Sequence, residues 1–136
     1  MAAKIHSKAI LGRRILVVDD DLDACIFYKT CLEENDFHVV IYTNPMIAAS
    51  RFLPDIYDLI LIDIRMPVIN GFELYEIIKK IDNRAKVCFI TAFEEYYESL
   101  KEQFIRLDAK YFIRKPIGAR ELVRQVISLL SNNRKK

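Results

Sequence analysis

Apolar and polar positions along the chain follow two alternating patterns that repeat five times. Short runs rich in β-branched residues, typical of buried strands, are each followed by a longer stretch with apolar residues at helical spacing. The pattern predicts strands at Arg14–Val18, His38–Tyr42, Leu59–Ile62, Lys86–Ile90 and Tyr111–Ile113. Strand and helix therefore alternate along the sequence, as they do in α/β proteins.

The stretches between the strands carry helix signals. The first predicted helix is Leu22–Asn35, and a second begins with Asn44 as N-cap and Pro45 in its first turn and ends before Pro54. A fourth helix is expected between the last two strands. The third and last helices have apolar stripes, formed by Leu74, Ile77, Ile78 and Ile81 in the third and by Leu122, Val123, Val126, Ile127 and Leu130 in the last.

The strands differ in how apolar they are, and this predicts their order. The first, third and fourth are continuously apolar and belong at the centre of a sheet, whereas the second and fifth are shorter or flanked by polar residues, as edge strands are. Strand–helix–strand connections are nearly always right-handed. We therefore expect a doubly wound, parallel (βα)5 sheet of the flavodoxin-like order 2-1-3-4-5.

Composition fits one domain in a chain of 136 residues, with 52% hydrophobic and 29% charged residues. A net charge of +2 is too small to predict a nucleic-acid surface. No apolar run approaches the ~18 residues of a membrane span, and three cysteines without a Cys-x-x-Cys pair fit buried thiols in a reducing compartment. We expect a cytoplasmic protein with an N-terminal arm at 1–13, one domain at 14–131 and a basic tail at 132–136.

Acidic residues follow two strands that this order makes neighbours. Asp19 and Asp20 come after the first strand, and Asp63 comes after the third. Since carboxyl ends of adjacent parallel strands meet at one edge, the carboxylates should lie together. Like charges ~4 Å apart cost several kcal/mol in a partly buried site. Mg²⁺ prefers hard oxygen ligands and would relieve that repulsion, so the sequence predicts a magnesium site.

A hydroxyl and a cation are expected at the same edge. The fourth strand ends near Thr91, and the fifth leads to Lys115. These are groups that would hold a phosphoryl group bound to Asp63. Taken singly, the residues also fit an acidic helix start, a strand-ending cap, a loop lysine and an ordinary strand threonine. Their joint occurrence at four strand ends argues against coincidence.

The chemistry-bearing motifs all stand at strand ends or in the loops behind them: Asp19–Asp20, Asp63, Met66–Pro67, Asn70–Gly71, Thr91–Ala92 and Lys115–Pro116. In this order and spacing they resemble the receiver domain of two-component response regulators, of the CheY-like single-domain type. The resemblance covers Arg14 to Leu130, nearly the whole chain.

This resemblance implies a metal-dependent phosphoacceptor. Asp63 would attack a phosphohistidine and become an aspartyl phosphate. Asp20 and Asp63 would bind Mg²⁺ directly, with Mn²⁺ able to substitute, while Asp19 would act largely through water and Arg65 would contribute its backbone carbonyl. Lys115 would pair with the charge of the phosphoryl group.

The resemblance also implies a switch. Thr91 would hydrogen-bond the phosphoryl group and move toward it, and Phe112 would turn inward, which changes the surface of the fourth helix, fifth strand and fifth helix. Many relatives have tyrosine at position 112, so packing alone would report the switch here. The interval from Thr91 to Lys115 is about two residues longer than is usual in that family. Asp108 stands where glycine is common before the fifth strand of the family. The fourth helix is therefore the element that the sequence determines least.

The resemblance also implies that two further positions tune the lifetime of the phosphorylated form. Arg65 and Phe93 stand two residues beyond Asp63 and Thr91. We hypothesise that these bulky side chains restrict the attack of water on the phosphoryl group.

The expected partners are a sensor histidine kinase or histidine phosphotransfer protein and a downstream protein target, with no nucleic acid and no membrane. The chain would be a signalling switch that catalyses only its own phosphorylation and dephosphorylation. It would act as a monomer or a phosphorylation-linked dimer. We expect a receiver that stands alone, with no DNA-binding domain after the last helix.

Other function classes fit less well. A phosphatase or mutase with an aspartate nucleophile would show a second acid where Arg65 stands, and a nucleotide-binding enzyme would need a glycine-rich loop, which Gly12, Gly71 and Gly118 do not form. The main alternative is a degenerate receiver that acts as an unphosphorylated interaction module.

Overall fold

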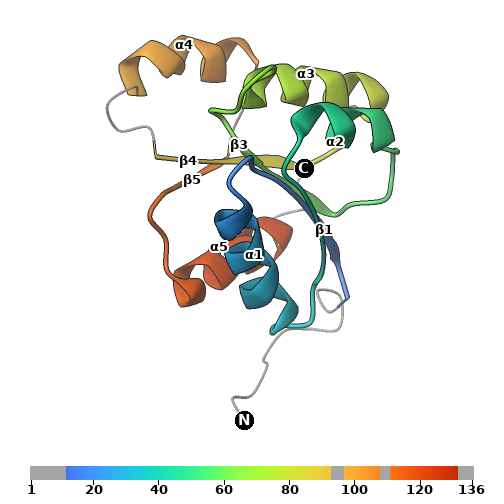
Figure 1. Cartoon of the computed structure of the whole chain (residues 1–136), viewed down its shortest axis with the longest axis vertical. Helices are drawn as coiled ribbons and strands as arrows, with labels where there is room; N and C mark the ends of the chain where they lie inside the picture. Colours follow the sequence, from blue (N-terminus) through green and yellow to red (C-terminus); the bar gives the residue numbers. More distant parts are fainter. Residues whose placement is uncertain (1–11, 93–96, 108–110, 132–136) are drawn as a thin grey trace.

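A computed structural model describes residues 12–92, 97–107 and 111–131 and shows a parallel sheet between two helical layers (Figure 1). The elements in chain order are β1 Arg14–Val18, α1 Leu22–Glu33, β2 His38–Tyr42, α2 Pro45–Arg51, β3 Leu59–Asp63, α3 Gly71–Ile81, β4 Val87–Thr91, α4 Tyr97–Arg106, β5 Phe112–Arg114 and α5 Ala119–Ser131. The five strands lie in the order β2-β1-β3-β4-β5. The expected fold class and strand order are confirmed.

Element boundaries depart from the predicted ones in four places. β3 extends through Asp63, and β4 and β5 each begin and end one residue later than expected. The cause is pairing, because Asp63 aligns with Ile90 and Thr91 with Arg114. α1 stops at Glu33 rather than Asn35, since Asp36 takes a left-handed φ of 71° that turns the chain toward β2.

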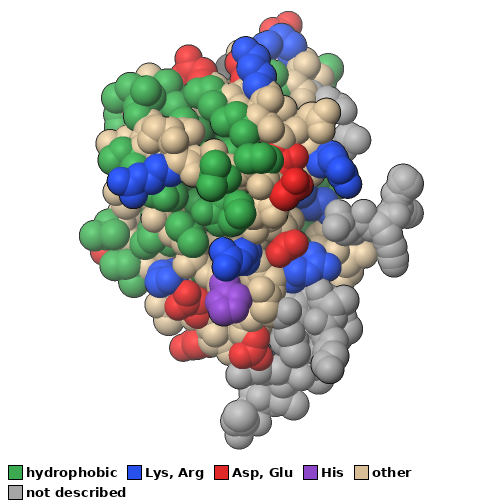
Figure 2. Space-filling model, turned by 90° about the vertical axis from the view of Figure 1, so that its right-hand side faces the viewer, with side chains coloured by type: hydrophobic (Ala, Val, Ile, Leu, Met, Phe, Trp, Pro, Cys, Tyr) green, Lys and Arg blue, Asp and Glu red, His purple; other side chains and the backbone are tan. Residues whose placement is uncertain are grey.

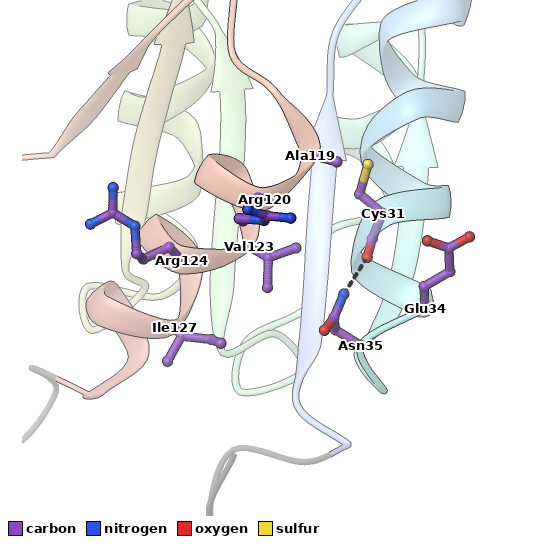
Figure 3. A pocket seen from close by; sticks show the side chains of 8 residues that line it. All are labelled: Cys31, Glu34, Asn35, Ala119, Arg120, Val123, Arg124 and Ile127. Carbon is purple, nitrogen blue, oxygen red and sulfur yellow. Dashed lines mark hydrogen bonds between the residues drawn. The ribbon is translucent and has the colours of Figure 1, made fainter. Parts of the chain in front are cut away.

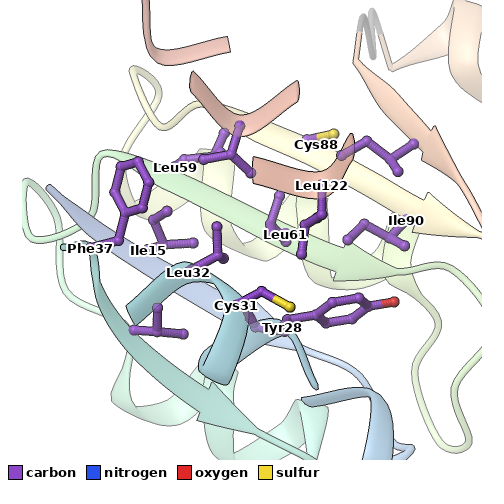
Figure 4. Close-up of a cluster of buried hydrophobic side chains, with 14 of the residues drawn as sticks. Ile15, Tyr28, Cys31, Leu32, Phe37, Leu59, Leu61, Cys88, Ile90 and Leu122 are labelled. Atoms are coloured by element: carbon purple, nitrogen blue, oxygen red, sulfur yellow. The ribbon is translucent and has the colours of Figure 1, made fainter. Parts of the chain in front are cut away.

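Each face of the sheet has its own apolar core. α1 and α5 cover one face, where Tyr28, Leu32 and Leu122 pack on side chains of the central strands (Figure 4). α2 and α3 cover the other, where Phe72 and Tyr75 pack on Phe89 of β4. Burying one such side chain stabilises the fold by about 1.5–3 kcal/mol. The two cores hold the central strands rigidly.

The exposure of each strand agrees with its place in the sheet, central or at an edge. All residues of β3 and β4 are buried, whereas β2 and β5 each have one buried residue and are otherwise exposed or half-buried, as expected of edge strands. Figure 2 shows apolar side chains at the surface on the side of β2 and α2, where Val40, Met46 and Ile47 are exposed. The three cysteines are buried and unpaired, as expected.

Polar side chains cap the amino ends of α1, α2 and α3. The Asp21 carboxylate accepts hydrogen bonds from two backbone N–H groups of α1, and Asn44 caps α2 as predicted. Asn70 and Glu73 form a reciprocal capping box at the start of α3. Each helix in the part of the chain that the structure describes is too short or too polar to span a lipid bilayer. Phe93, Asp108, the tail 132–136 and most of the arm 1–13 lie outside the described residues.

Gly71 allows α3 to start directly against the end of β3. Its N–H donates to the Ile64 carbonyl at 2.8 Å, and a Cβ placed on Gly71 would lie 2.5 Å from the carbonyl oxygen of Asp63. Real Cβ atoms do not approach backbone so closely. Only glycine at this position lets the start of α3 approach the backbone that carries Asp63 so closely.

We predict that Gly71→Ala destabilises the protein by about 2 kcal/mol, because the added methyl group forces the backbone of β3 to shift. Urea unfolding measures this change. Gly118→Ala is the matched control, since a Cβ there meets nothing within 4 Å, and it should cost less than about 1 kcal/mol. Equal effects of the two substitutions would contradict the close approach at Gly71.

Candidate functional site

Three carboxylates converge at the carboxyl edge of the sheet. Oxygen atoms of Asp19, Asp20 and Asp63 all lie within 4.8 Å of one another. The register explains this, because Val18 of β1 pairs with Ile62 of β3, so the next residue on each strand falls side by side. Asp19 and Asp63 are buried, while Asp20 is exposed. The structure thus brings together the acids that the sequence pointed to.

Asp19 is the most tightly held of the three. Its Oδ1 accepts the N–H of Asp21 at 2.9 Å, and its own N–H donates to the Tyr42 carbonyl at 3.2 Å. Beneath it, the Cys25 thiol donates to the Asp19 carbonyl at 3.2 Å. These contacts occupy one oxygen of the Asp19 carboxylate and fix the backbone at the end of β1.

Lys115 enters the site from the loop after β5. Its Nζ lies 3.0 Å from Oδ2 of Asp19 and 3.3 Å from Oδ1 of Asp63. The backbone N–H of Lys115 donates to the Thr91 carbonyl at 3.0 Å, and the following peptide bond to Pro116 is cis. One ammonium group therefore bridges the acids that follow two different strands.

Burial makes these charges unequal. It is the largest cause that raises the pKa of Asp63 to about 6, with the charge of Asp19 adding to it and Lys115 opposing it. For Lys115, burial by itself lowers the pKa, but the nearby negative charges of Asp63 and Asp19 outweigh it, so the net direction is upward. Lys115 therefore stays charged, whereas burial disfavours the charged form of Asp63 because the carboxylate loses its hydration.

The remaining expected site residues surround this centre. Thr91, at the end of β4, is 1% exposed, and its strand neighbour across the sheet is Arg114. Phe112 on β5 is 43% exposed. Arg65 is exposed two residues beyond Asp63. Phe93, the other residue expected to tune the phosphorylated lifetime, lies outside the described residues.

The donor set fits a hard divalent cation. One ammonium group contacts two of the three carboxylates, so negative charge remains in excess, and the cluster offers only oxygen ligands. This is the ligand chemistry of Mg²⁺ rather than of a metal that prefers thiolate or imidazole. Because Asp19 already binds Asp21 and Lys115, the oxygens of Asp20 and Asp63 are the more available ligands.

Sequence reasoning missed several groups that support the site. Asp21 follows the acid pair directly; its N–H donates to the Asp19 carboxylate and its own carboxylate caps α1. The sequence predicts only that Cys25 is a buried thiol, and no pattern indicates that it donates to the Asp19 carbonyl. Gly71 was quoted in a motif, but its contact with the Asp63 backbone needs the fold.

A separate pocket of about 410 Å³ lies between the end of α1 and α5 (Figure 3). At its rim the Asn35 side chain donates to the Cys31 carbonyl at 3.0 Å. It shares no residue with the acid cluster, and its lining consists of Cys31, Glu34, Asn35, Ala119, Arg120, Val123, Arg124 and Ile127. It is therefore a different feature from the site described above.

Known proteins with similar sequences and structures agree on one family. A family model of the response regulator receiver domain matches residues 15–127. The response regulator receiver protein CpdR of Brucella abortus is 34% identical over 118 residues, 87% of this chain and 97% of that protein. Two other curated relatives are longer, and the chain spans 50% and 52% of their lengths.

Solved structures give the same answer. The non-phosphorylated receiver domain of HemR from Leptospira biflexa has a TM-score of 0.79 and 31% identity, with 91% of this chain and 98% of that chain covered. The response regulator TrrA from Thermotoga maritima, in complex with Mg²⁺ and BeF, has a TM-score of 0.72 and 30% identity, with coverages of 86% and 98%. From its fold, its acid cluster and these similarities, the chain belongs to the response regulator receiver domains of two-component signalling.

Proposed function

We propose that this receiver domain takes a phosphoryl group onto Asp63 in a magnesium-dependent reaction. The observation that carries the proposal is the convergence of Asp63 with two further acids and the ammonium group of Lys115. Attack by a carboxylate on a phosphorus centre needs in-line positioning and positive charge near the equatorial oxygens. Lys115 supplies the positive charge beside Asp63, and within the described residues no other group of acids clusters in this way.

Each residue then has a defined part. The Asp63 carboxylate is the nucleophile, and Lys115, 3.3 Å away, pairs with negative charge that develops on the transferred group. Mg²⁺, when bound by Asp20, Asp63 and the Arg65 carbonyl, would neutralise phosphoryl oxygens and the acids themselves. Asp19 orients Lys115 and would act on the metal largely through water. The Thr91 hydroxyl, at the end of β4, is the hydrogen-bond donor to the bound phosphoryl group.

Phosphorylation would be transmitted through β4 and β5. A phosphoryl group on Asp63 would attract the hydroxyl of Thr91. The ring of Phe112, 43% exposed on the neighbouring strand β5, would then turn into the space that Thr91 leaves. Because Phe112 has no hydroxyl, the change is reported by packing alone. The surface of α4, β5 and α5 is the one that a downstream protein would read.

Partners follow from this chemistry. The phosphoryl group would come from a histidine kinase or a histidine phosphotransfer protein, and the reader of the switched surface would be a protein target in the cytoplasm. The chain would serve as a switch rather than as an enzyme that turns over separate substrates. It would work as a monomer or as a dimer that forms on phosphorylation.

We predict a covalent phosphoryl adduct when the protein is incubated with Mg²⁺ and acetyl phosphate, measured by intact mass. Asp63→Asn should abolish the adduct, because an amide is not a nucleophile. Asp58→Asn is the matched control: this residue precedes β3, at the opposite end of the strand, and binds Arg13 and Arg14. It should leave the adduct unchanged. An unmodified wild-type protein under all conditions would favour the passive interaction module.

The raised pKa of Asp63 predicts an unusual pH dependence of stability. Between pH 3.8 and about 6 the unfolded chain releases this proton while the folded protein retains it, so stability falls through this window and remains lower above it. Asp63→Asn should therefore stabilise the metal-free protein by about 2 kcal/mol at pH 7.5 and by much less at pH 4. Urea unfolding in EDTA measures both differences.

Adding Mg²⁺ at pH 7.5 should raise the stability of the wild type, because the ion binds only the folded acid cluster. The Asp63→Asn variant should gain far less. An equal benefit of the substitution at both pH values, or an equal gain from Mg²⁺ in both proteins, would show that Asp63 does not carry this buried charge.

We propose that Arg65 and Phe93 lengthen the phosphorylated lifetime by excluding water from the phosphoryl group. A double variant, Arg65→Asn with Phe93→Ala, should lose its phosphoryl group roughly tenfold faster, since smaller side chains admit the attacking water. Radiolabelled phosphate retained over time measures this rate. Dephosphorylation that accelerates little in the double variant would count against the idea.

A further inference from the structure

Tyr28 presents a buried polar atom for which the fold gives no structural reason. The side chain is 3% exposed within the core between α1, α5 and the sheet. Within the described part of the chain its hydroxyl has no hydrogen bond, in contrast to Tyr75, whose hydroxyl donates to the Leu107 carbonyl at 3.1 Å. Buried hydroxyls are normally paired, because removing them from water is costly. Phenylalanine would fill the same space without that cost.

The direction of the side chain points to a purpose. Long side chains on a helix lean back toward its amino end, and α1 begins directly behind the acid pair. One turn before Tyr28, the Cys25 thiol already touches the Asp19 carbonyl. Figure 4 shows the Tyr28 ring beneath the sheet with its hydroxyl directed the same way as the strand arrows, toward the edge where the acids lie.

Electrostatics agrees with this placement. Burial is the largest cause that raises the pKa of Tyr28 to about 12, and the charge of Lys115 is the next, acting in the opposite direction. The charges of Asp19 and Asp63 also act on this hydroxyl. Tyr28 is therefore a neutral phenol that lies within the field of the acid site and can accept or donate a hydrogen bond.

Within the described residues, the ammonium group of Lys115 has one N–H donor that neither Asp19 nor Asp63 accepts. An ammonium group carries three N–H donors, and Asp19 and Asp63 take two of them. A phosphoryl group on Asp63 would draw the ammonium group away from this carboxylate, so Lys115 needs a support that does not change during the reaction. Asp19 supplies one such support from the side.

We propose, on the basis of the function assigned to Asp63, that Tyr28 is a positioning residue for Lys115, whose ammonium group donates to a water molecule that in turn donates to the buried Tyr28 hydroxyl. The hydroxyl supports the ammonium group from the α1 side of the sheet and aims it at the phosphoryl oxygens. α1 thereby contributes to the phosphoryl site from the core as well as from its capped first turn.

A double-mutant cycle in urea unfolding, without metal, tests the contact itself. Tyr28→Phe removes only the hydroxyl, and Lys115→Met keeps the length of the lysine without its charge. Tyr28→Phe should raise the unfolding constant about fivefold when Lys115 is present and less than twofold in the Lys115→Met background. The same factor in both backgrounds would overturn the proposal, because the hydroxyl would then act independently of Lys115.

Phosphorylation kinetics test the consequence. With acetyl phosphate and Mg²⁺, Tyr28→Phe should lower the rate at saturating phosphodonor about tenfold and leave the half-saturating concentration unchanged. Tyr57→Phe is the matched control, since Tyr57 stacks on Phe52 before β3, at the amino end of the sheet. An unchanged rate in Tyr28→Phe overturns the proposal.

The two measurements separate this inference from the proposed function. A wild-type protein that accepts no phosphoryl group contradicts the role of Asp63, and the unfolding cycle still decides whether Tyr28 and Lys115 are coupled. A phosphorylated wild type with no effect of Tyr28→Phe contradicts only the inference.

Discussion

The ion contact between Lys115 and the two buried acids is the constraint on which the rest of the structure depends. Charges removed from water are costly unless they are paired closely, and here one ammonium group lies 3.0 Å from Asp19 and 3.3 Å from Asp63. The three groups come from the ends of β1, β3 and β5. Their pairing therefore requires the whole parallel sheet to be assembled in one order, and it still leaves negative charge that a divalent cation can neutralise.

Backbone contacts around the acids restrict the movement of Asp19 and Asp63. Gly71 lets α3 rest on the Asp63 backbone, and the Cys25 thiol supports the Asp19 carbonyl from below. Fully buried central strands carry the acids into position, whereas Phe112 and Arg65 stand at exposed positions. Rigid support for the acid cluster combined with an exposed side chain on β5 is the arrangement that the proposed phosphorylation switch requires.

Periodicity predicted most elements because each strand buries continuous apolar runs or one apolar face. It failed at the strand ends, where polar residues such as Asp63 and Thr91 still pair with β4 and β5, and pairing is a tertiary property. It gave no sign that Val68, a β-branched residue in the loop before α3, takes a φ of 74°. Local sequence preferences cannot reveal backbone conformations that neighbouring elements impose.

The sequence by itself determined the fold class and the identity of Asp19, Asp20, Asp63, Thr91 and Lys115 as the groups at one sheet edge, because apolar period and strand ends are local features. The strand order followed when the contrast between central and edge strands was combined with the right-handed connections of a flavodoxin-like sheet. Only the tertiary structure decided which of these are buried, that Lys115 bridges two of them, and that Tyr28 directs a hydroxyl toward them from the core. Burial and charge pairing depend on residues far apart in the chain, 96 positions for Lys115 and Asp19, so no local pattern contains them.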